Sequence, residues 1–559
     1  MSLGPQCWRC RKRRLRCDSS LPACRKCCAA NIECPGYGEK RPIAWRKPIL
    51  LTDKGIVRIR VNGVNEKPAA ASVMGMMCRS PRTVGSELEL RITADAIDYY
   101  NLRVAPDLVP YATRKSPYQI PTSVVGELAE YVRKAYISIS ALHRLVTGGP
   151  HTISQFASDG TTAPQSAVRS QAKAELDASD ASEISELMAA RDFKSVHFAS
   201  QAAAMRALSE DLQRHQSASH IDDALPDFLL GIMLMLSSQV NLPESYAPWQ
   251  THIDGAWGLI TAQGGVEVIA RQNHDHYRVL QQIAAVDIFG ISTDHLTTSS
   301  ASTILSRHAS YASVFDKGSV GILNPWTLMP KSLAKTLNQI NMLRAQEVLD
   351  PSRWRTEEGL LAVLKSLEKA SPESWAVDVA TNATVWLAPG LSDDEHTRAA
   401  WKALMAAFLN ATILYAINSL AGLIGTSNRE SFDRDSHPST SHKDPAAFEA
   451  LLLSIQFLLD QRVQQQEPNV HPASAATSAG LLHMFVIWPM VVGGIQAALV
   501  HRDEKTIAYL CAGMQAIGEE LVSMIDGARL VDKLWRSHKN GFELTSWDGL
   551  FDGAPLFLM

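Results

Sequence analysis

Motifs that mark common enzyme classes are missing from the sequence. Its 559 residues contain no Gly-x-Ser-x-Gly nucleophile elbow, no phosphate-binding Walker loop and no Gly-x-Gly-x-x-Gly after a predicted strand. A compact group of metal-binding residue types, His274, Asp275 and His276, is expected to lie in a polar loop between helices rather than to bind a metal. We therefore expect a protein that is not an enzyme.

Cysteine is scarce outside the first 34 residues. Seven of the nine cysteines fall in residues 7–34, and the other two, Cys78 and Cys511, are isolated, as expected of ordinary core or loop thiols. The chain opens with MSLGPQCW, which has no apolar segment, so we expect no signal peptide and no secretion. Disulfides form in oxidising compartments, and a disulfide scaffold is therefore not the expected use of the clustered cysteines.

Six of the clustered cysteines form two near-identical halves with the pattern C-x2-C-x6-C-x6-C-x2-C-x6-C. Each half offers three thiolates, whereas a structural zinc ion takes four ligands in a tetrahedron. The shortage disappears if the first cysteine of each half, Cys7 and Cys24, bridges two zinc ions. The spacing therefore predicts a cluster of two Zn2+ that folds this short stretch, with Cys28 outside the pattern. The predicted ligands are Cys7, Cys10, Cys17, Cys24, Cys27 and Cys34.

The stretch resembles the DNA-binding module of the fungal Zn2Cys6, or zinc binuclear cluster, transcription regulators at all six cysteines. Two further features match. A basic run, RKRRLR, fills residues 11–16 between the second and third cysteines, and Pro22 stands two residues before Cys24. The resemblance implies that the basic run lies on a helix that enters the major groove and that Pro22 shapes the loop to a second helix.

The resemblance also implies which side chains contact DNA. Arg14 matches the position that reaches base edges of a CGG-type triplet, where an arginine bonds both acceptors of a guanine. Lys12 and Arg13 are further candidates for base contacts. The side chains expected to hold phosphates are Arg11, Arg16, Arg25 and Lys26.

Charge is distributed unevenly along the chain. Residues 1–60 hold 15 Lys and Arg against 4 Asp and Glu, a net charge of +11, and the other 499 residues carry −14. Lysine and arginine near the DNA backbone release counterions, whereas an acidic body is repelled. The asymmetry indicates that double-stranded DNA contacts the amino-terminal part alone. No sustained heptad pattern follows the cluster before residue 120, so any homodimer is expected to form through the later helical part.

The chain is expected to be a small Zn2Cys6 binuclear cluster module followed by a large all-α regulatory domain. A disordered start at 1–6 precedes the DNA-binding domain at 7–34. Residues 35–92 form a basic, weakly structured connection with a short hairpin within 49–65, and 93–559 form the helical domain, with mobile loops at about 147–181 and 427–443. Helical periodicity predicts helices over 94–108, 123–146, 185–216, 225–240, 277–291, 333–348, 357–367, 396–423 and 445–463.

A second motif occupies residues 248–265, PWQTHIDGAWGLITAQGG. It resembles the W-x2-H-x2-G-A segment with a trailing Gly-Gly of the fungal-specific transcription factor domain of the second type. The spacing predicts a helix that is stopped by the glycine pair. We interpret its histidine as a hydrogen-bonded core residue rather than a catalytic one. The matching residues are Trp249, His252, Gly255, Ala256, Gly264 and Gly265, and the face expected to pack in the core carries Trp249, His252, Ala256 and Leu259.

Residues 468–501 contain no formally charged side chain, and 480–500 are long enough to span a bilayer. A transmembrane helix is therefore an alternative here. Pro489 and the glycine pair Gly493 and Gly494, together with the lack of a second strong candidate, favour a buried core helix. The sequence Ile487, Trp488, Pro489 also resembles the WP-containing helix of the same fungal domain. We expect a core helix and no membrane partner.

The last residues, TSWDGLFDGAPLFLM, interleave aromatic and acidic side chains. Such interleaving suits an activation segment that docks in a coactivator groove. Packing of the same residues onto the helical domain is an equally good interpretation. A truncation that leaves transcriptional output unchanged would remove the activation interpretation.

Together these features predict a nuclear, sequence-specific DNA-binding transcription factor of the RNA polymerase II type from a fungus. Its partners would be G·C-rich double-stranded DNA and the transcription machinery or a coactivator. The expected role is that of a pathway-specific regulator of a secondary-metabolite gene cluster, with drug or stress resistance and transporter genes as the alternative. The helical body is either a domain that binds a small effector or a partner, or a scaffold for dimerisation.

Overall fold

A computed structural model of the chain divides into two compact units, residues 1–67 and 68–559. It describes residues 17, 24–29, 50–52, 55–57, 86–107, 118–147, 179–216, 225–240, 249–272, 274–315, 327–351, 353–382, 395–421, 439–465, 478–518, 523–541 and 546–551. Within these ranges the second unit has helices and no strands. The predicted plan of a small module followed by a large all-α domain is confirmed.

The first unit contains a short helix and a hairpin. Helix α2 spans Arg25–Ala29, and the strands β1, Leu50–Thr52, and β2, Gly55–Val57, pair antiparallel with Leu50 opposite Val57. The hairpin predicted within 49–65 is confirmed. A two-stranded hairpin and a helix of five residues bury too little apolar surface to fold alone. Hydrophobic packing of the described elements alone therefore does not account for the stability of this unit.

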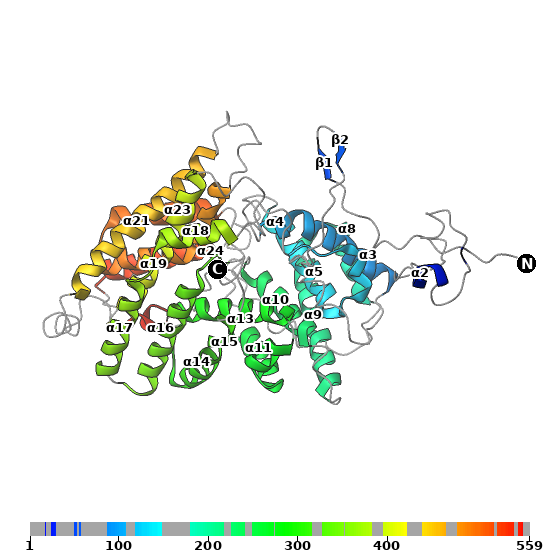
Figure 1. Ribbon diagram of the computed structural model, residues 1–559, viewed down its shortest axis with the longest axis horizontal. Helices are drawn as coiled ribbons and strands as arrows, with labels where there is room; N and C mark the ends of the chain where they lie inside the picture. The colour runs from blue at the N-terminus through cyan, green and yellow to red at the C-terminus, as the bar shows by residue number, and fades with distance from the viewer. Residues whose placement is uncertain are drawn as a thin grey trace, which may run out of the picture. The chain divides into compact units, whose positions relative to one another are not determined.

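The second unit begins with helices that pack around α5, Glu130–Val146 (Figure 1). Its neighbours are α3, Glu87–Tyr99, α9, Phe193–Gln216, and α10, Leu225–Val240. Every residue of α5 from 131 to 142 is buried, because these three helices enclose it. The remaining elements of this part are the π-helix η4 Tyr100–Val104, α4 Ala105–Asp107, the 3-10 helix η5 Thr122–Glu127 and α8 Ser179–Ala189.

Two predicted helices are each broken in two. The segment 123–146 starts as η5 and becomes α5 only after Leu128, whose backbone is extended and whose carbonyl accepts a hydrogen bond from Arg133 Nη1 at 2.6 Å. The segment 185–216 is divided into α8 and α9 at Arg191, whose φ is +57°. Asp192 then starts α9, because its Oδ1 accepts the backbone N–H of Ser195 at 3.1 Å.

Three helices begin six or seven residues earlier than predicted. Helix α3 starts at Glu87 rather than at 94, because the side chain of Ser86 accepts the backbone N–H of Glu89 at 3.2 Å and caps the helix. Helix α8 starts at Ser179 and α21 at Ser439, inside the loops expected at 147–181 and 427–443. Those loop boundaries were wrong by a few residues, because a polar composition does not by itself exclude a helical start.

The carboxyl-terminal part is a larger helical bundle. Its helices α12, α14, α15, α18, α23 and α24 were not predicted, and α13 begins at His274, so that His274, Asp275 and His276 lie in its first turn rather than in a polar loop. The elements are α11 Trp249–Ala262, α12 Val266–Gln272, α13 His274–Ser292, α14 Thr298–Ser310, α15 Ala312–Phe315, α16 Lys331–Leu349, α17 Arg353–Leu367, α18 Pro372–Asn382, α19 Glu395–Leu420, α21 Ser439–Gln465, the 3-10 helix η7 Ser478–Val486, α22 Ile487–Ile495, the π-helix η8 Gln496–His501, α23 Glu504–Gly518, α24 Ser523–Lys539 and the 3-10 helix η9 Asp548–Phe551.

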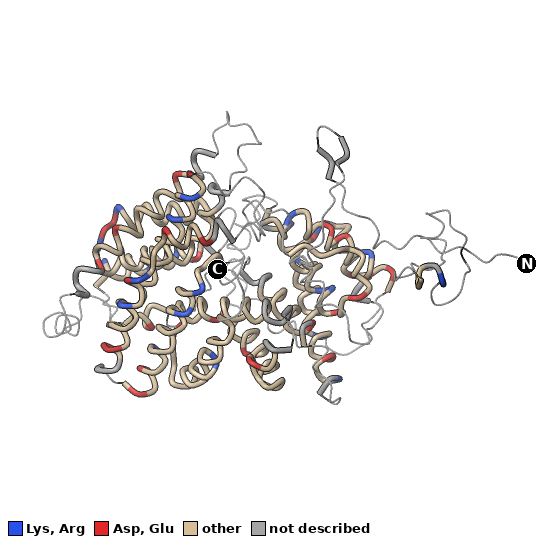
Figure 2. The backbone as a smooth tube through the Cα atoms, in the orientation of Figure 1, with Lys and Arg blue, Asp and Glu red and all other residues tan. Residues whose placement is uncertain are grey.

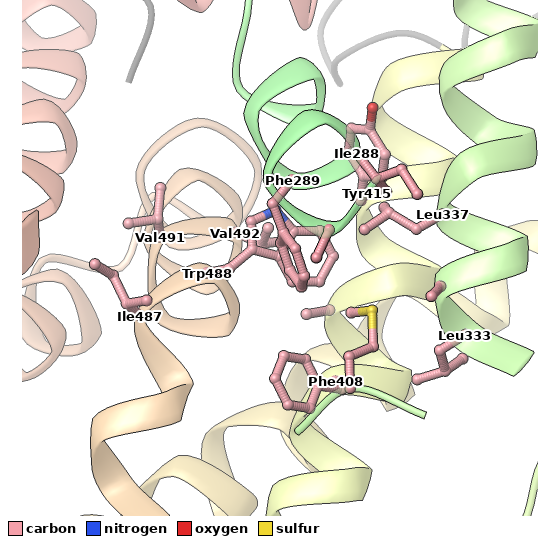
Figure 3. Packing of buried hydrophobic residues seen from close by; sticks show 14 of the residues in the cluster. Ile288, Phe289, Leu333, Leu337, Phe408, Tyr415, Ile487, Trp488, Val491 and Val492 are labelled. Carbon is pink, nitrogen blue, oxygen red and sulfur yellow. The ribbon is translucent and has the colours of Figure 1, made fainter. Parts of the chain in front are cut away.

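Trp488 of α22 packs among the buried side chains of this bundle (Figure 3). Its ring centroid lies 5.7 Å from that of Phe289 on α13 and 6.0 Å from that of Tyr415 on α19. Its Nε1 donates to Ser292 Oγ at 2.8 Å. Pro489 follows in the first turn of α22, where a helix tolerates the missing N–H.

The apolar segment is buried in the fold, as predicted for a core helix. The stretch Leu482–His501 and helix α19 are each long and apolar enough to cross a membrane, so the expected lack of a second candidate was wrong. However, 83% and 67% of their apolar windows are buried inside the protein. A helix that is apolar nearly all round suits such a buried position.

Charged residues of both signs are interspersed over the described helices (Figure 2), and a few are buried in pairs. Asp287 of α13 accepts hydrogen bonds from Arg307 Nη2 at 2.7 Å and from Tyr311 Oη at 2.8 Å, and Arg307 Nη1 donates to Asp254 of α11 at 2.7 Å. Burial alone would raise the pKa of Asp287, but Arg307 and His308 hold that pKa below its usual value. The ionised carboxylate therefore ties α13 to α14, and Arg307 extends the connection to α11.

Gly290 of α13 lies against the buried ring of Trp249 on α11. A Cβ at Gly290 would stand 2.2 Å from Trp249 Cη2, so we expect Gly290→Ala to lower the free energy of unfolding by about 1–3 kcal/mol. Gly258→Ala is the matched control, because nothing lies within 4 Å of that Cβ position and α11 exposes it. The control should raise stability by about 0.5–1 kcal/mol. Urea unfolding of the full chain measures both, and equal effects would contradict this packing.

His197 of α9 is buried beside Ser138, and burial lowers its pKa to about 4 from an ordinary 6.5. Between these values the unfolded chain binds a proton that the folded chain rejects, so stability falls as the pH decreases through this window. The loss amounts to about 3 kcal/mol. We expect His197→Gln to remove this part of the pH dependence. Urea midpoints at neutral pH and near pH 5 test the expectation, which fails if variant and wild type lose stability equally.

Candidate zinc centre and nucleic-acid interface

Three of the six predicted zinc ligands lie in the described part of the chain. Cys17, Cys24 and Cys27 are 3%, 0% and 2% exposed, although arginine and lysine dominate the surrounding sequence. Cys7, Cys10 and Cys34 lie outside the described residues. Cysteines that turn inward in a unit without a large apolar core have the placement that metal ligands require.

Cys24 and Cys27 are joined by one tight turn at the start of α2. The backbone N–H of Cys27 donates to the Cys24 carbonyl at 3.0 Å and approaches Cys24 Sγ at 3.4 Å, and the N–H of Cys28 donates to the same carbonyl at 3.1 Å. A single tight turn thus carries both cysteines, as the C-x2-C spacing predicted.

The described cysteines fit a two-zinc cluster. If Cys24 bridges, one ion takes Cys17 and Cys24 and the other takes Cys24 and Cys27, and the remaining ligands come from cysteines outside the described ranges. Among the described residues, no three His, Cys, Asp or Glu side chains group closely enough to hold a metal by themselves. An all-sulfur donor set suits Zn2+.

The predicted DNA-contacting residues fall into two groups. Arg25 and Lys26 open α2, the helix that also carries Cys27, and the Arg25 side chain is exposed. The basic run at 11–16, which includes Arg14, lies outside the described residues, so its contacts stay predictions. Cys28 follows Cys27 on α2 and is exposed.

Helix α11 carries the second motif and ends as its glycine pair predicts. Gly264 and Gly265 have φ values of +87° and +91°, and the N–H of Gly265 donates to the Ile260 carbonyl at 2.9 Å. Glycine adopts such φ values without steric cost and so ends the helix.

The predicted buried face of α11 was partly wrong. The face that packs inward consists of Trp249, Ile253, Ala256 and Ile260, whereas His252 and Leu259 are only half-buried at its edge. Burial lowers the pKa of His252, which favours the neutral ring expected of a packed histidine. Asp254, which the motif spacing did not single out, forms the ion pair with Arg307.

The carboxyl-terminal segment is part of the helical core. Trp547 and Phe551 are each 1% exposed. Trp547 Nε1 donates to the Ser292 carbonyl at 2.8 Å, and Asp548 Oδ1 accepts from Arg344 Nη2 at 2.6 Å. Of the two interpretations of this segment, packing onto the helical domain is therefore confirmed for residues 546–551, and 552–559 lie outside the described ranges. Sequence patterns had not identified Arg344 as its partner.

Two family descriptions match the chain, and together they cover most of it. "Fungal specific transcription factor domain" matches residues 96–559, and "Fungal Zn(2)-Cys(6) binuclear cluster domain" matches residues 6–42. The second match contains all six patterned cysteines and the basic run. A domain of this family binds two zinc ions, which form its binuclear cluster.

Two curated proteins are similar to this chain, one over nearly its whole length and one over a short segment. The chain is similar to the phomenoic acid biosynthesis cluster-specific transcriptional regulator of Leptosphaeria maculans, with 22% identity over 582 aligned positions that cover 99% of this chain and 89% of the relative. It is also similar to the acriflavine sensitivity control protein acr-2 of Neurospora crassa, with 59% identity over 32 residues that cover 6% of this chain and 5% of the relative. No solved structure matches the chain significantly.

Cys27 and Cys28 offer a matched test of the zinc ligands, because they are adjacent on α2 and only Cys27 is buried. We expect Cys27→Ala to lower the zinc content of the purified chain below two ions, and Cys28→Ala to keep two. Elemental analysis of the full-length protein measures the ratio. Retention of two zinc ions by Cys27→Ala, or a loss by Cys28→Ala, would contradict the ligand assignment.

Proposed function

Because the chain belongs to the fungal Zn(2)-Cys(6) transcription factors that carry a fungal specific transcription factor domain, we propose that it acts in the nucleus as a sequence-specific regulator of a biosynthetic gene cluster. The observation that carries the DNA-binding part is that Cys17, Cys24 and Cys27 are buried, and that Cys27 lies on helix α2, which begins with the exposed Arg25. A thiolate cluster inside a basic module fits the binding of double-stranded DNA.

The proposed cluster uses the six patterned cysteines, with Cys7 and Cys24 as bridges. When bound, the two zinc ions supply the cross-links that hold the module folded. The chain's own residues then do the recognition. Arg14 reads a guanine of a CGG-type triplet through a bidentate hydrogen bond, with Lys12 and Arg13 as its neighbours. The side chains proposed to hold phosphates are Arg11, Arg16, Arg25 and Lys26.

The proposed organisation keeps the cluster at 7–34, a basic connection at 35–92 and the helical domain from 93 onward. Dimerisation, where it occurs, is proposed to involve the helical domain, because the sequence before residue 120 lacks a coiled-coil pattern. The division agrees with the charge distribution, since the basic residues gather in the first 60 positions.

The proposal that the chain regulates a biosynthetic gene cluster is supported by the relative that matches nearly its whole length. That protein is named as the regulator of one biosynthesis cluster, and its similarity extends over 99% of this chain. Control of drug or stress resistance and transporter genes is the alternative, but the relative connected with acriflavine sensitivity matches only 6% of the chain. A match that spans the regulatory domain supports a shared role better than one confined to 32 residues.

Genome-wide mapping of the sites bound by the tagged full-length protein tests the proposal in the source fungus. We expect occupied sites that contain CGG-type triplets and that concentrate at the promoters of one biosynthetic locus. Occupied promoters of transporter and resistance genes would support the alternative instead. The absence of zinc-dependent, site-specific occupancy would overturn both.

Arg14 and Arg25 are expected to differ in what they contribute to binding. Arg14→Ala should cost about 1–3 kcal/mol on cognate DNA and relax the preference at one base pair, because it removes a base contact. Arg25→Ala should weaken cognate and random DNA alike, because a phosphate contact carries no sequence information. Titrations of both duplexes at one fixed salt concentration measure this. Equal losses on cognate and random DNA for Arg14→Ala would refute its role.

A further inference from the structure

The segment at 546–551, SWDGLF, has the chemistry of a docking motif. Within six residues it combines Trp547, Leu550 and Phe551 with the carboxylate of Asp548. Its only regular structure is the short 3-10 helix η9. Aromatic and aliphatic anchors beside an acidic side chain are what an apolar groove with a basic rim recognises in a partner peptide.

The folded chain holds this motif through a small set of contacts. The end of α13 and the residues just after it supply three of them. The carbonyl of Ser292, the last residue of α13, accepts from Trp547 Nε1 at 2.8 Å. The Leu296 N–H donates to Asp548 Oδ1 at 3.1 Å, and His295 Nδ1 lies 3.0 Å from the Asp548 carbonyl. Arg344 supplies the fourth, its ion pair with Asp548 at 2.6 Å. The Trp547 ring packs 5.1 Å from the ring of Tyr415.

Arg344 and the acceptors around it, here called the Arg344 socket, keep three hydrogen bonds without Asp548, although Arg344 Nε is buried and has no hydrogen-bond partner among the described residues. Nη1 donates to the Ile291 carbonyl at 2.9 Å and to Tyr415 Oη at 2.7 Å, and Nη2 donates to the Asp294 carbonyl at 3.0 Å. Both terminal nitrogens therefore keep an acceptor when Asp548 leaves. A buried charge that retains its hydrogen bonds is far less costly than one left without them.

A second buried arginine shows the contrast. The carboxylate of Asp287, partner of Arg307, is 0% exposed and is also held by Tyr311. The carboxylate of Asp548 is 25% exposed, so solvent reaches its pair with Arg344. A partly hydrated pair opens more readily than an enclosed one. The pair of Arg307 with Asp287 is thus enclosed, whereas the pair of Arg344 with Asp548 is reached by solvent.

We propose that residues 546–551 form a latch, in which the Arg344 socket holds an acidic–aromatic coactivator-docking motif out of reach until the segment is released. The latch rests on the proposed function, since only a promoter-bound regulator has use for such a motif. The partner is a coactivator protein with a basic-rimmed apolar groove that takes Trp547 and Phe551 as anchors. In the closed state both anchors are buried and that partner has nothing to bind.

The affinity of the partner is then limited by the fraction of chains that are open. Asp548→Asn keeps the shape of the side chain and removes its charge, so it weakens the charge-assisted bond to Arg344 and raises the open population by about tenfold. Asp532→Asn is the matched control, because it removes a carboxylate from an exposed ion pair with Arg536 on α24.

Two measurements on the full-length chain test the latch. Hydrogen–deuterium exchange of the purified protein reports opening directly: residues 546–551 should exchange faster in Asp548→Asn and at the wild-type rate in Asp532→Asn. Reporter output divided by promoter occupancy reports docking, and it should rise several-fold in Asp548→Asn alone. Adding Trp547→Ala to Asp548→Asn should abolish the gain, because the anchor is lost.

The outcomes separate the latch from the proposed function. Absent promoter occupancy in the wild type would defeat the proposed function, while the exchange measurement still reports whether the segment opens. Normal occupancy with unchanged or lower output per bound promoter in Asp548→Asn would overturn the latch, as would a gain that survives the loss of Trp547. Global acceleration of exchange in Asp548→Asn would also overturn it, since the segment would then be a structural part of the core alone.

Discussion

The buried guanidinium of Arg344 fixes how the carboxyl-terminal half of the helical domain is assembled. Burial alone would lower the pKa of Arg344, but Tyr415 and Asp548 hold that pKa above its usual value, so the group stays charged and has to be surrounded by acceptors. Those acceptors are the last turn of α13, the hydroxyl of Tyr415 on α19 and the carboxyl-terminal segment, 204 positions further along the chain. One charge thereby connects elements that no local pattern relates.

The two units are stabilised in different ways. The described part of the first has a five-residue helix and a hairpin of three-residue strands, and its family binds two zinc ions, which can hold so small a module folded. The described part of the second buries a continuous set of aromatic and aliphatic side chains, among them Trp488 and Tyr415. A module held by metal can be small and basic, whereas a domain held by a hydrophobic core has to be larger.

Buried polar side chains of the helical domain form hydrogen bonds that connect different helices. Asp287 and Arg307 connect α13 with α14, His197 of α9 meets Ser138 of α5, and Asn418 of α19 donates to Gln496 of η8 at 2.7 Å. Among the described residues these groups pair with one another, and none belongs to a metal-binding group.

The sequence by itself determined the features that are encoded within one or two turns. The cysteine spacing identified the cluster, periodicity placed α10 at 225–240, and the glycine pair marked the end of α11. Helix starts at Ser86 and Asp192 were missed, although their capping side chains were legible in the sequence. Only the tertiary structure decided which face of α11 is buried, that Trp249 packs on Gly290, and that Asp548 meets Arg344. These choices depend on contacts between residues far apart in the chain, whose energies no local pattern contains.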